Sequence, residues 1–205
     1  MSFLQQLLSQ PVQALAFLLA VILAITVHEF SHAWIADRLS DPTPRSQGRV
    51  SLSPLAHLDP LGSLAFLLVG FGWGRPVSYD PSYFRHRYDE LLVALAGPIS
   101  NVLLAVLVHL LLLGVRPATS PAEILGLVAS INVTLAAFNL LPFPPLDGSS
   151  IIAFFWPEYR SQRYAQIGSI VLLATLFLLP RLLGTVLSPI IATISWFSRL
   201  FGLLP

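Results

Sequence analysis

The stretch that decides the fold is PVQALAFLLAVILAITVHEFSH, which runs from Pro11 to His32. Residues 11–27 are almost entirely apolar, and the pentapeptide HEFSH follows them at residues 28–32. Seventeen helical residues span about 25 Å at ~1.5 Å per residue, which is close to the thickness of the hydrocarbon core of a bilayer. The stretch therefore predicts a membrane-crossing helix that carries ionisable side chains at one end.

The composition predicts a membrane protein independently of this motif. Hydrophobic residues make up 55% of the 205-residue chain and charged residues only 10%, and the mean hydropathy is +0.77. An all-α polytopic membrane protein with about five transmembrane helices is the predicted fold class. One membrane domain is expected over residues 1–205, with a core at 11–156 and additional C-terminal helices at 164–204. The five predicted spans are residues 11–27, 91–115, 122–141, 164–180 and 182–204.

The segment between the first two spans has a different pattern. Residues 61–72 are apolar but too few to cross a bilayer, and the run Gly70-Phe71-Gly72-Trp73-Gly74 ends them. Such a piece is expected to be re-entrant or interfacial. Polar and apolar side chains alternate from Arg49 to Ser53, which predicts a short strand.

The pair His28 and His32 predicts a metal site. Two histidines four residues apart lie on one face of a helix, so both imidazoles can reach one zinc ion. Glu29 follows the first histidine, where its carboxylate can take a proton from water without being a ligand. The alternative is a histidine pair that only hydrogen-bonds to its neighbours. That alternative is weaker here, because ionisable groups at membrane depth cost roughly 2.5 to 3.5 kcal/mol each and are functional by default.

The arginines predict the orientation in the membrane, since the chain contains no lysine. Positively charged loops stay on the cytoplasmic side, so the arginine-rich loop at residues 37–90 is expected inside and the N-terminus outside. The loop between the second and third spans offers only Arg116. The arginines at or within the first loop are Arg38, Arg45, Arg49, Arg75, Arg85 and Arg87.

This orientation predicts where a third metal ligand should lie. His28 stands about 24 Å along the first span from Val12, which puts the site a few ångströms below the cytoplasmic surface. Zinc needs at least three protein ligands, and the chain has no cysteine to supply a thiolate. Asp147 follows the third span on the same side and is the candidate. Its spacing alone leaves open a second interpretation, a loop aspartate that forms a turn with Gly148.

Four stretches together resemble the site-2 protease family of intramembrane zinc metalloproteases. They are HEFSH at residues 28–32, the Asn-x-x-Pro-x-Pro-x-Leu-Asp-Gly pattern at 139–148, GPISN at 97–101, and GRVSLSPLAHLDP at 48–60. The resemblance is to a short form of the family, without PDZ or CBS domains. Residues 48–60 resemble the membrane-associated loop of that family, which contains a β-loop.

The resemblance implies a catalytic zinc site with one ion per chain. His28, His32 and Asp147 would be the ligands, and Glu29 would activate the attacking water and later protonate the leaving amine. Asn139 would hold the substrate or the oxyanion, and Asn101 is a second candidate for that role.

The resemblance also implies the substrates and the location. The enzyme would cut transmembrane or membrane-tethered proteins near the cytoplasmic face, as in regulated intramembrane proteolysis. It would reside among lipids in a bacterial or archaeal cell membrane, and no nucleic-acid partner is expected.

Two other functions remain open from the sequence. A membrane zinc carrier or scaffold would need further ligands across the bilayer, but His57, Asp59 and His109 do not line a path with the first site. A carrier also has no need of the general base at Glu29. A metallohydrolase that acts on a lipid or a soluble amide differs from a protease only in its substrate.

Overall fold

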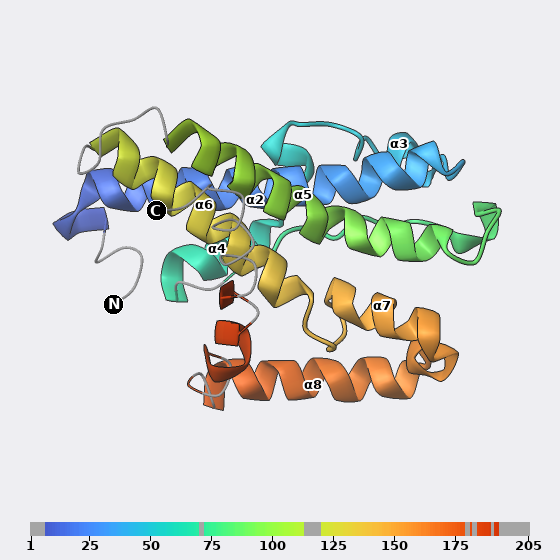
Figure 1. Cartoon of the computed structure of the whole chain (residues 1–205). Helices are drawn as coiled ribbons and strands as arrows, with labels where there is room; N and C mark the ends of the chain where they lie inside the picture. Colours follow the sequence, from blue (N-terminus) through green and yellow to red (C-terminus); the bar gives the residue numbers. More distant parts are fainter. Residues whose placement is uncertain are drawn as a thin grey trace.

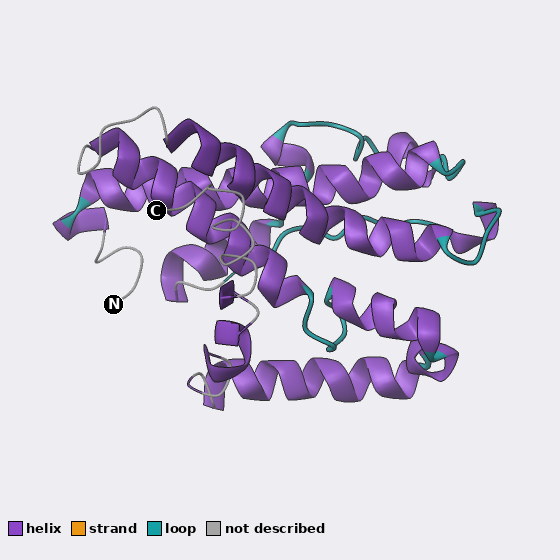
Figure 2. Ribbon diagram, in the orientation of Figure 1, coloured by secondary structure: helices purple, strands orange, loops and turns teal. Residues whose placement is uncertain are grey.

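Three long helices form the centre of the molecule in the computed structural model, which describes residues 7–69, 72–112, 120–178, 181, 184–189 and 191–192. They are α2 (Pro11–Arg38), α5 (Asp89–Leu112) and α6 (Ser120–Asn139). All three are long and apolar enough to cross a membrane. Figure 1 shows them side by side, with α5 in contact with both of the others. The described residues contain helices and loops but no named strand, which confirms the all-α class (Figure 2).

The two expected C-terminal spans are not confirmed as membrane helices. The fourth, predicted at 164–180, corresponds to α8 (Gln162–Leu178), a 17-residue helix that follows α7 (Asp147–Phe155) and the short η3 (Pro157–Arg160). Figure 1 shows α8 alongside α7, below the three long helices. Most of the fifth, at 182–204, lies outside the described residues.

Helix α2 is longer than its apolar stretch predicts. It has 28 residues, which is about 42 Å at ~1.5 Å per residue, so it continues roughly 15 Å beyond His28. The polar residues after the apolar run still favour a helix, because no glycine or proline occurs between Val12 and Arg38. The helix ends just before Ser40, which has a positive φ of 81°. HEFSH therefore lies inside a helix and not at its end.

Small residues allow the three long helices to approach one another closely. Alanines predominate at their buried positions, whereas many leucines on the same helices are exposed. This distribution is typical of membrane helices, whose apolar outer faces meet lipid and whose small residues face neighbouring helices. The buried alanines are Ala14, Ala20, Ala24, Ala33 and Ala36 in α2, Ala94 and Ala105 in α5, and Ala129, Ala136 and Ala137 in α6.

The segment between α2 and α5 does not form the expected short strand. At residues 49–53 the Ser51 amide donates to the carbonyl of Arg49 at 2.9 Å, which turns the chain back on itself. Pro54 then begins the short helix η1 (Pro54–Ala56). The described part of this segment has only one isolated antiparallel bridge, between Leu58 and Gly74. The remaining helical pieces are α3 (Thr43–Ser46), α4 (Pro60–Val69) and η2 (Pro81–Tyr83).

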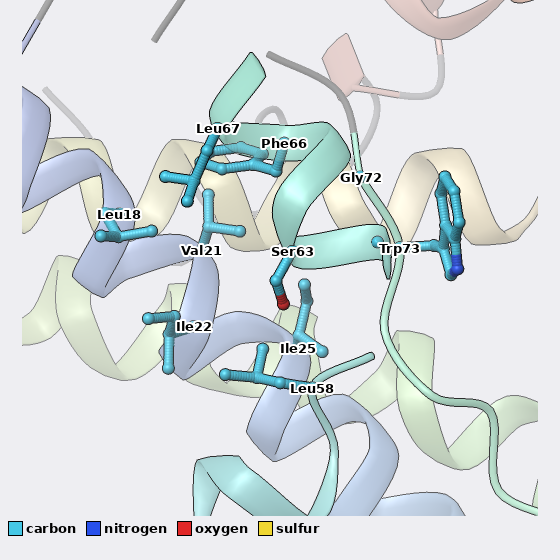
Figure 3. A pocket seen from close by; sticks show the side chains of 11 residues that line it. Leu18, Val21, Ile22, Ile25, Leu58, Ser63, Phe66, Leu67, Gly72 and Trp73 are labelled. Carbon is cyan, nitrogen blue, oxygen red and sulfur yellow. The ribbon is translucent and has the colours of Figure 1, made fainter. Parts of the chain in front are cut away.

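Helix α4 accounts for most of the short apolar stretch and packs against α2. The rings of Phe17 and Phe66 stack with centroids 5.9 Å apart, and a cavity of about 180 Å³ lies between the two helices (Figure 3). The carbonyl of Trp73 approaches Gly62 so closely that a Cβ there would collide with it. The chain after α4 thus returns to contact the start of that helix at Gly62. Gly70 and Phe71 lie outside the described residues. The structure does not test whether the stretch is re-entrant.

Candidate metal centre

The two histidines of HEFSH meet Asp147 at one point. His28 and His32 lie one turn apart on α2 and are 4% and 7% exposed. Asp147 is the first residue of α7, and its Oδ2 lies 3.1 Å from His28 Nε2 and 3.3 Å from His32 Nε2. The two Nε2 atoms are 3.1 Å apart. This triangle is a group of potential metal ligands within the described residues.

The triangle fits a zinc ion. Ligands about 2.0–2.1 Å from a tetrahedral zinc are separated by roughly 3.3 Å, and all three observed separations are close to that value. Asp147 Oδ2 is buried and accepts no hydrogen bond from any residue that the structure describes. A buried oxygen without a donor needs another partner, and a metal ion would provide one.

The outer nitrogens of both imidazoles have their own partners. His28 Nδ1 donates to Asn101 Oδ1 at 2.6 Å, and His32 Nδ1 donates to the carbonyl of Val93 at 2.7 Å. Bonds of this kind place the proton on Nδ1 and turn the Nε2 lone pair toward the metal position. Helix α5 thus orients both histidines of α2.

The burial and hydrogen bonds of Asn101 favour a role behind His28 over the contact with substrate that the sequence leads us to expect. Its side chain is fully buried, and its Nδ2 donates to Ala24 O at 3.1 Å and to Asn132 Oδ1 at 2.7 Å. All of its polar atoms are therefore used inside the protein. Its position supports His28, and Asn132 is a further member of this network that the sequence did not reveal.

Removal of the Asn101 amide should weaken zinc binding. The variant Asn101→Ala leaves His28 Nδ1 without its acceptor, and loss of such an outer partner typically costs about 10- to 100-fold in metal affinity or activity. Competition with a chelating dye measures the zinc dissociation constant. Ser100→Ala is the matched control, because Ser100 Oγ donates only to Gly97 O of its own helix. Equal affinities in the two variants would contradict the orienting role.

Gly97 leaves the space in which the two imidazoles meet. A Cβ at this position would collide with His32 Nε2 and would lie 2.6 Å from His28 Cε1. The sequence showed this glycine only as part of the GPISN element, since no local signal indicates which helix it faces. The next residue, Pro98, is also buried and lies inside α5.

Glu29 lies beside the histidines without joining the ligand triangle. Its side chain is 15% exposed, and its Oε2 accepts a hydrogen bond from the Val77 amide at 3.1 Å. Gly74 also lies close, since a Cβ there would be 3.8 Å from Glu29 Oε1. Residues 74–77 therefore run past the carboxylate.

Asn139 lines a cavity at the end of α6. The cavity has a volume of about 440 Å³, and Gly74, Pro145 and Leu146 line it as well. Asn139 is half-buried, and its Nδ2 donates to the Leu135 carbonyl one turn earlier at 3.0 Å. Its predicted contact with substrate stays a prediction.

Three further candidate ligands, His57, Asp59 and His109, have hydrogen-bond partners of their own. His57 Nε2 donates to Ser51 O at 2.6 Å, and burial lowers the pKa of His57 below its usual range. Asp59 Oδ1 accepts from the Gly62 amide at 2.7 Å near the start of α4. His109 hydrogen-bonds to Ala105 O in its own helix. Among the described residues, the group of potential metal ligands contains His28, His32 and Asp147 and none of these three residues.

Comparisons with known proteins identify the family of this chain. The family described as peptidase family M50 matches residues 117–179, which include the Asn139 to Gly148 pattern. The Bacillus subtilis (strain 168) protein named "Putative zinc metalloprotease YwhC" is 34% identical over 190 residues, which cover 86% of this chain and 87% of that protein.

More distant relatives carry the same kind of name. "Putative zinc metalloprotease Rip2" of Mycolicibacterium smegmatis is 33% identical over 62% of this chain and 52% of its own length. Its namesake in Mycobacterium tuberculosis (strain H37Rv) is 31% identical over 80% of this chain and 66% of its own length. No solved structure matches the chain. The chain belongs to peptidase family M50, the site-2 protease family, and is a zinc metalloprotease.

Proposed function

We propose that this protein is an intramembrane zinc endopeptidase that cuts transmembrane or membrane-tethered proteins near the cytoplasmic face. One observation carries the proposal. His28, Glu29 and His32 lie inside α2, a helix long and apolar enough to cross a membrane, and Asp147 completes their triangle. If the metal ligands of a protease lie on a membrane-spanning helix, its active site is at the depth of the peptide bonds of membrane proteins.

The proposed reaction divides the chemistry between the metal and Glu29. His28, His32 and Asp147 would hold a zinc ion, which would supply Lewis-acid polarisation of the scissile carbonyl and a lower pKa for bound water. The Glu29 carboxylate takes a proton from the attacking water and delivers it to the nitrogen of the leaving amine. The hydrogen bond from the Val77 amide holds one carboxylate oxygen in place, so the other can face the water.

The substrate must present an extended backbone at this site. An intact helix hides its carbonyls behind hydrogen bonds and side chains, so it has to unwind before water can attack. We propose that the exposed carbonyl enters the cavity lined by Asn139 and that this amide holds the substrate or the oxyanion. Asn101 acts through His28 instead.

The proposed cytoplasmic location of the site rests on the arginines. Arg49 is only 2% exposed and so does not count as a surface charge in the loop between α2 and α5. Five arginines remain at or within this loop, against Arg116 alone between α5 and α6, and the positive-inside rule still favours a cytoplasmic loop. The N-terminus would then lie outside the cell membrane.

A panel of substrates tests the proposal. Purified protein in detergent, loaded with zinc, is incubated with several single-span proteins, with soluble peptides of the same sequences lacking the span, and with a lipid amide. We expect cleavage of single-span proteins in preference to the soluble peptides and no release of fatty acid from the lipid amide. Efficient turnover of the lipid amide or of soluble peptides alone would contradict the proposed substrate class.

A further inference from the structure

Arg49 is a buried cation beside Glu29. It is among the largest fully buried side chains of the described residues, with 2% exposure. Its Nη2 lies 3.8 Å from Glu29 Oε2, the same oxygen that accepts the hydrogen bond from Val77. Nη2 also donates to the backbone carbonyl of Arg75. One guanidinium nitrogen therefore faces both the carboxylate and the chain that passes it.

In the segment from Gly74 to Val77, the backbone amide and the backbone carbonyl of Arg75 are both hydrogen-bonded. The Arg75 amide donates to His57 O at 2.7 Å, while its carbonyl accepts from Arg49. Two residues later, the Val77 amide donates to Glu29. Arg49 thus contributes to the placement of Glu29 in two ways, through its own charge and through the position of the Val77 amide.

Among the described residues, the guanidinium of Arg49 is hydrogen-bonded through a single nitrogen. Nε and Nη1 are buried and have no hydrogen-bond partner among the described residues. Nη2 makes both the hydrogen bond to the Arg75 carbonyl and the approach to the Glu29 carboxylate.

We propose that Arg49 is the positioning residue for Glu29. It places the carboxylate by a charge at Oε2 and, through the Arg75 carbonyl, by the Val77 amide. This inference rests on the proposed role of Glu29 as the general base. It makes the loop between α2 and α5 part of the catalytic apparatus, although Arg49 does not belong to the group of potential metal ligands.

The variant Arg49→Ala tests this role by separating turnover from binding. We expect kcat on a single-span substrate to fall about 10- to 100-fold, as for loss of other outer partners of a metal site. KM should change less than about threefold and zinc stoichiometry should stay at the wild-type value. Guanidinium chloride added at millimolar concentration should restore part of kcat, because it can occupy the space that the side chain leaves. A folding defect alone would not be repaired by this ion.

Arg45→Ala is the matched control. Arg45 belongs to the same loop, but its side chain is 66% exposed and pairs with Asp37 at 2.6 Å, away from Glu29. Its kcat should equal that of wild type with or without guanidinium. If Arg49→Ala is not recovered folded, Arg49→Lys takes its place, and we expect a severalfold lower kcat at unchanged KM because one ammonium cannot reproduce the planar guanidinium.

The outcomes distinguish this inference from the proposed function. A wild-type kcat in the Arg49 variant, a loss confined to KM or zinc content, or no response to guanidinium would overturn the positioning role alone. Absence of cleavage by the wild type, or full cleavage by Glu29→Gln, would instead remove the proposed function on which it rests.

Discussion

Glu29→Gln is expected to slow proteolysis by about 10²- to 10⁴-fold while the protein keeps its zinc. The amide is nearly the same size as the carboxylate and can still accept the hydrogen bond from Val77, but it cannot take a proton from water. General acid–base catalysis contributes about 10²- to 10⁴-fold, so cleavage of a single-span substrate should fall by that factor. Gel quantification of the products and metal analysis of the same sample measure both quantities.

Glu123→Gln provides the control for this change. Glu123 is an exposed glutamate in the first turn of α6, so its variant should cleave at the wild-type rate. Zinc retention in Glu29→Gln is expected because Glu29 lies outside the ligand triangle. Cleavage at the wild-type rate in Glu29→Gln would show that another group activates the water.

Gly97→Ala is expected to cost the protein its zinc. The added methyl group would collide with His32 Nε2 and crowd His28. The Nδ1 atoms of both imidazoles are hydrogen-bonded to residues of α5. The imidazole rings cannot move away from the methyl group without losing those hydrogen bonds. We expect the zinc affinity to fall by about 100-fold or more, at the upper end of the range for disturbed metal sites. Proteolysis should be lost with it.

The loss of zinc expected in Gly97→Ala is opposite to what helix propensity alone would predict for a glycine-to-alanine change. Glycine is less favourable than alanine inside a helix by roughly 1 kcal/mol. If Gly97 served only as a helix residue, its replacement by alanine would therefore stabilise the protein. Gly126→Ala is the matched control, since a Cβ at Gly126 in α6 meets nothing within 4 Å. It should bind zinc as wild type does. Normal zinc affinity in Gly97→Ala would contradict the observed geometry of the site.

The sequence predicted the features that depend on local pattern. The spacing of His28 and His32 places both on one face of any helix, and the apolar run before them indicates a membrane span. The first three predicted spans correspond to α2, α5 and α6. Asp147 needed the family resemblance, because only tertiary structure brings the start of α7 to α2.

Features that depend on partners from other segments could not be predicted. The amides of Asn101 and Asn132 are ordinary polar residues in sequence, and their network with His28 appears only when α2, α5 and α6 pack together. Alternation at residues 49–53 predicted a strand, but the Ser51 amide bonds to the Arg49 carbonyl there, and the Arg49 side chain is buried beside Glu29. The same burial removes Arg49 from the surface charges that predict topology.

The position of the cut tests the central claim most directly. A single-span substrate is reconstituted with the zinc-loaded enzyme in liposomes, and mass spectrometry of the products identifies the broken bond. The proposed site predicts a cut within the cytoplasmic half of the substrate's transmembrane segment, which is slowed in Glu29→Gln. A cut confined to the soluble tails, or one that persists unchanged in Glu29→Gln, would contradict intramembrane hydrolysis at the site formed by His28, His32 and Asp147.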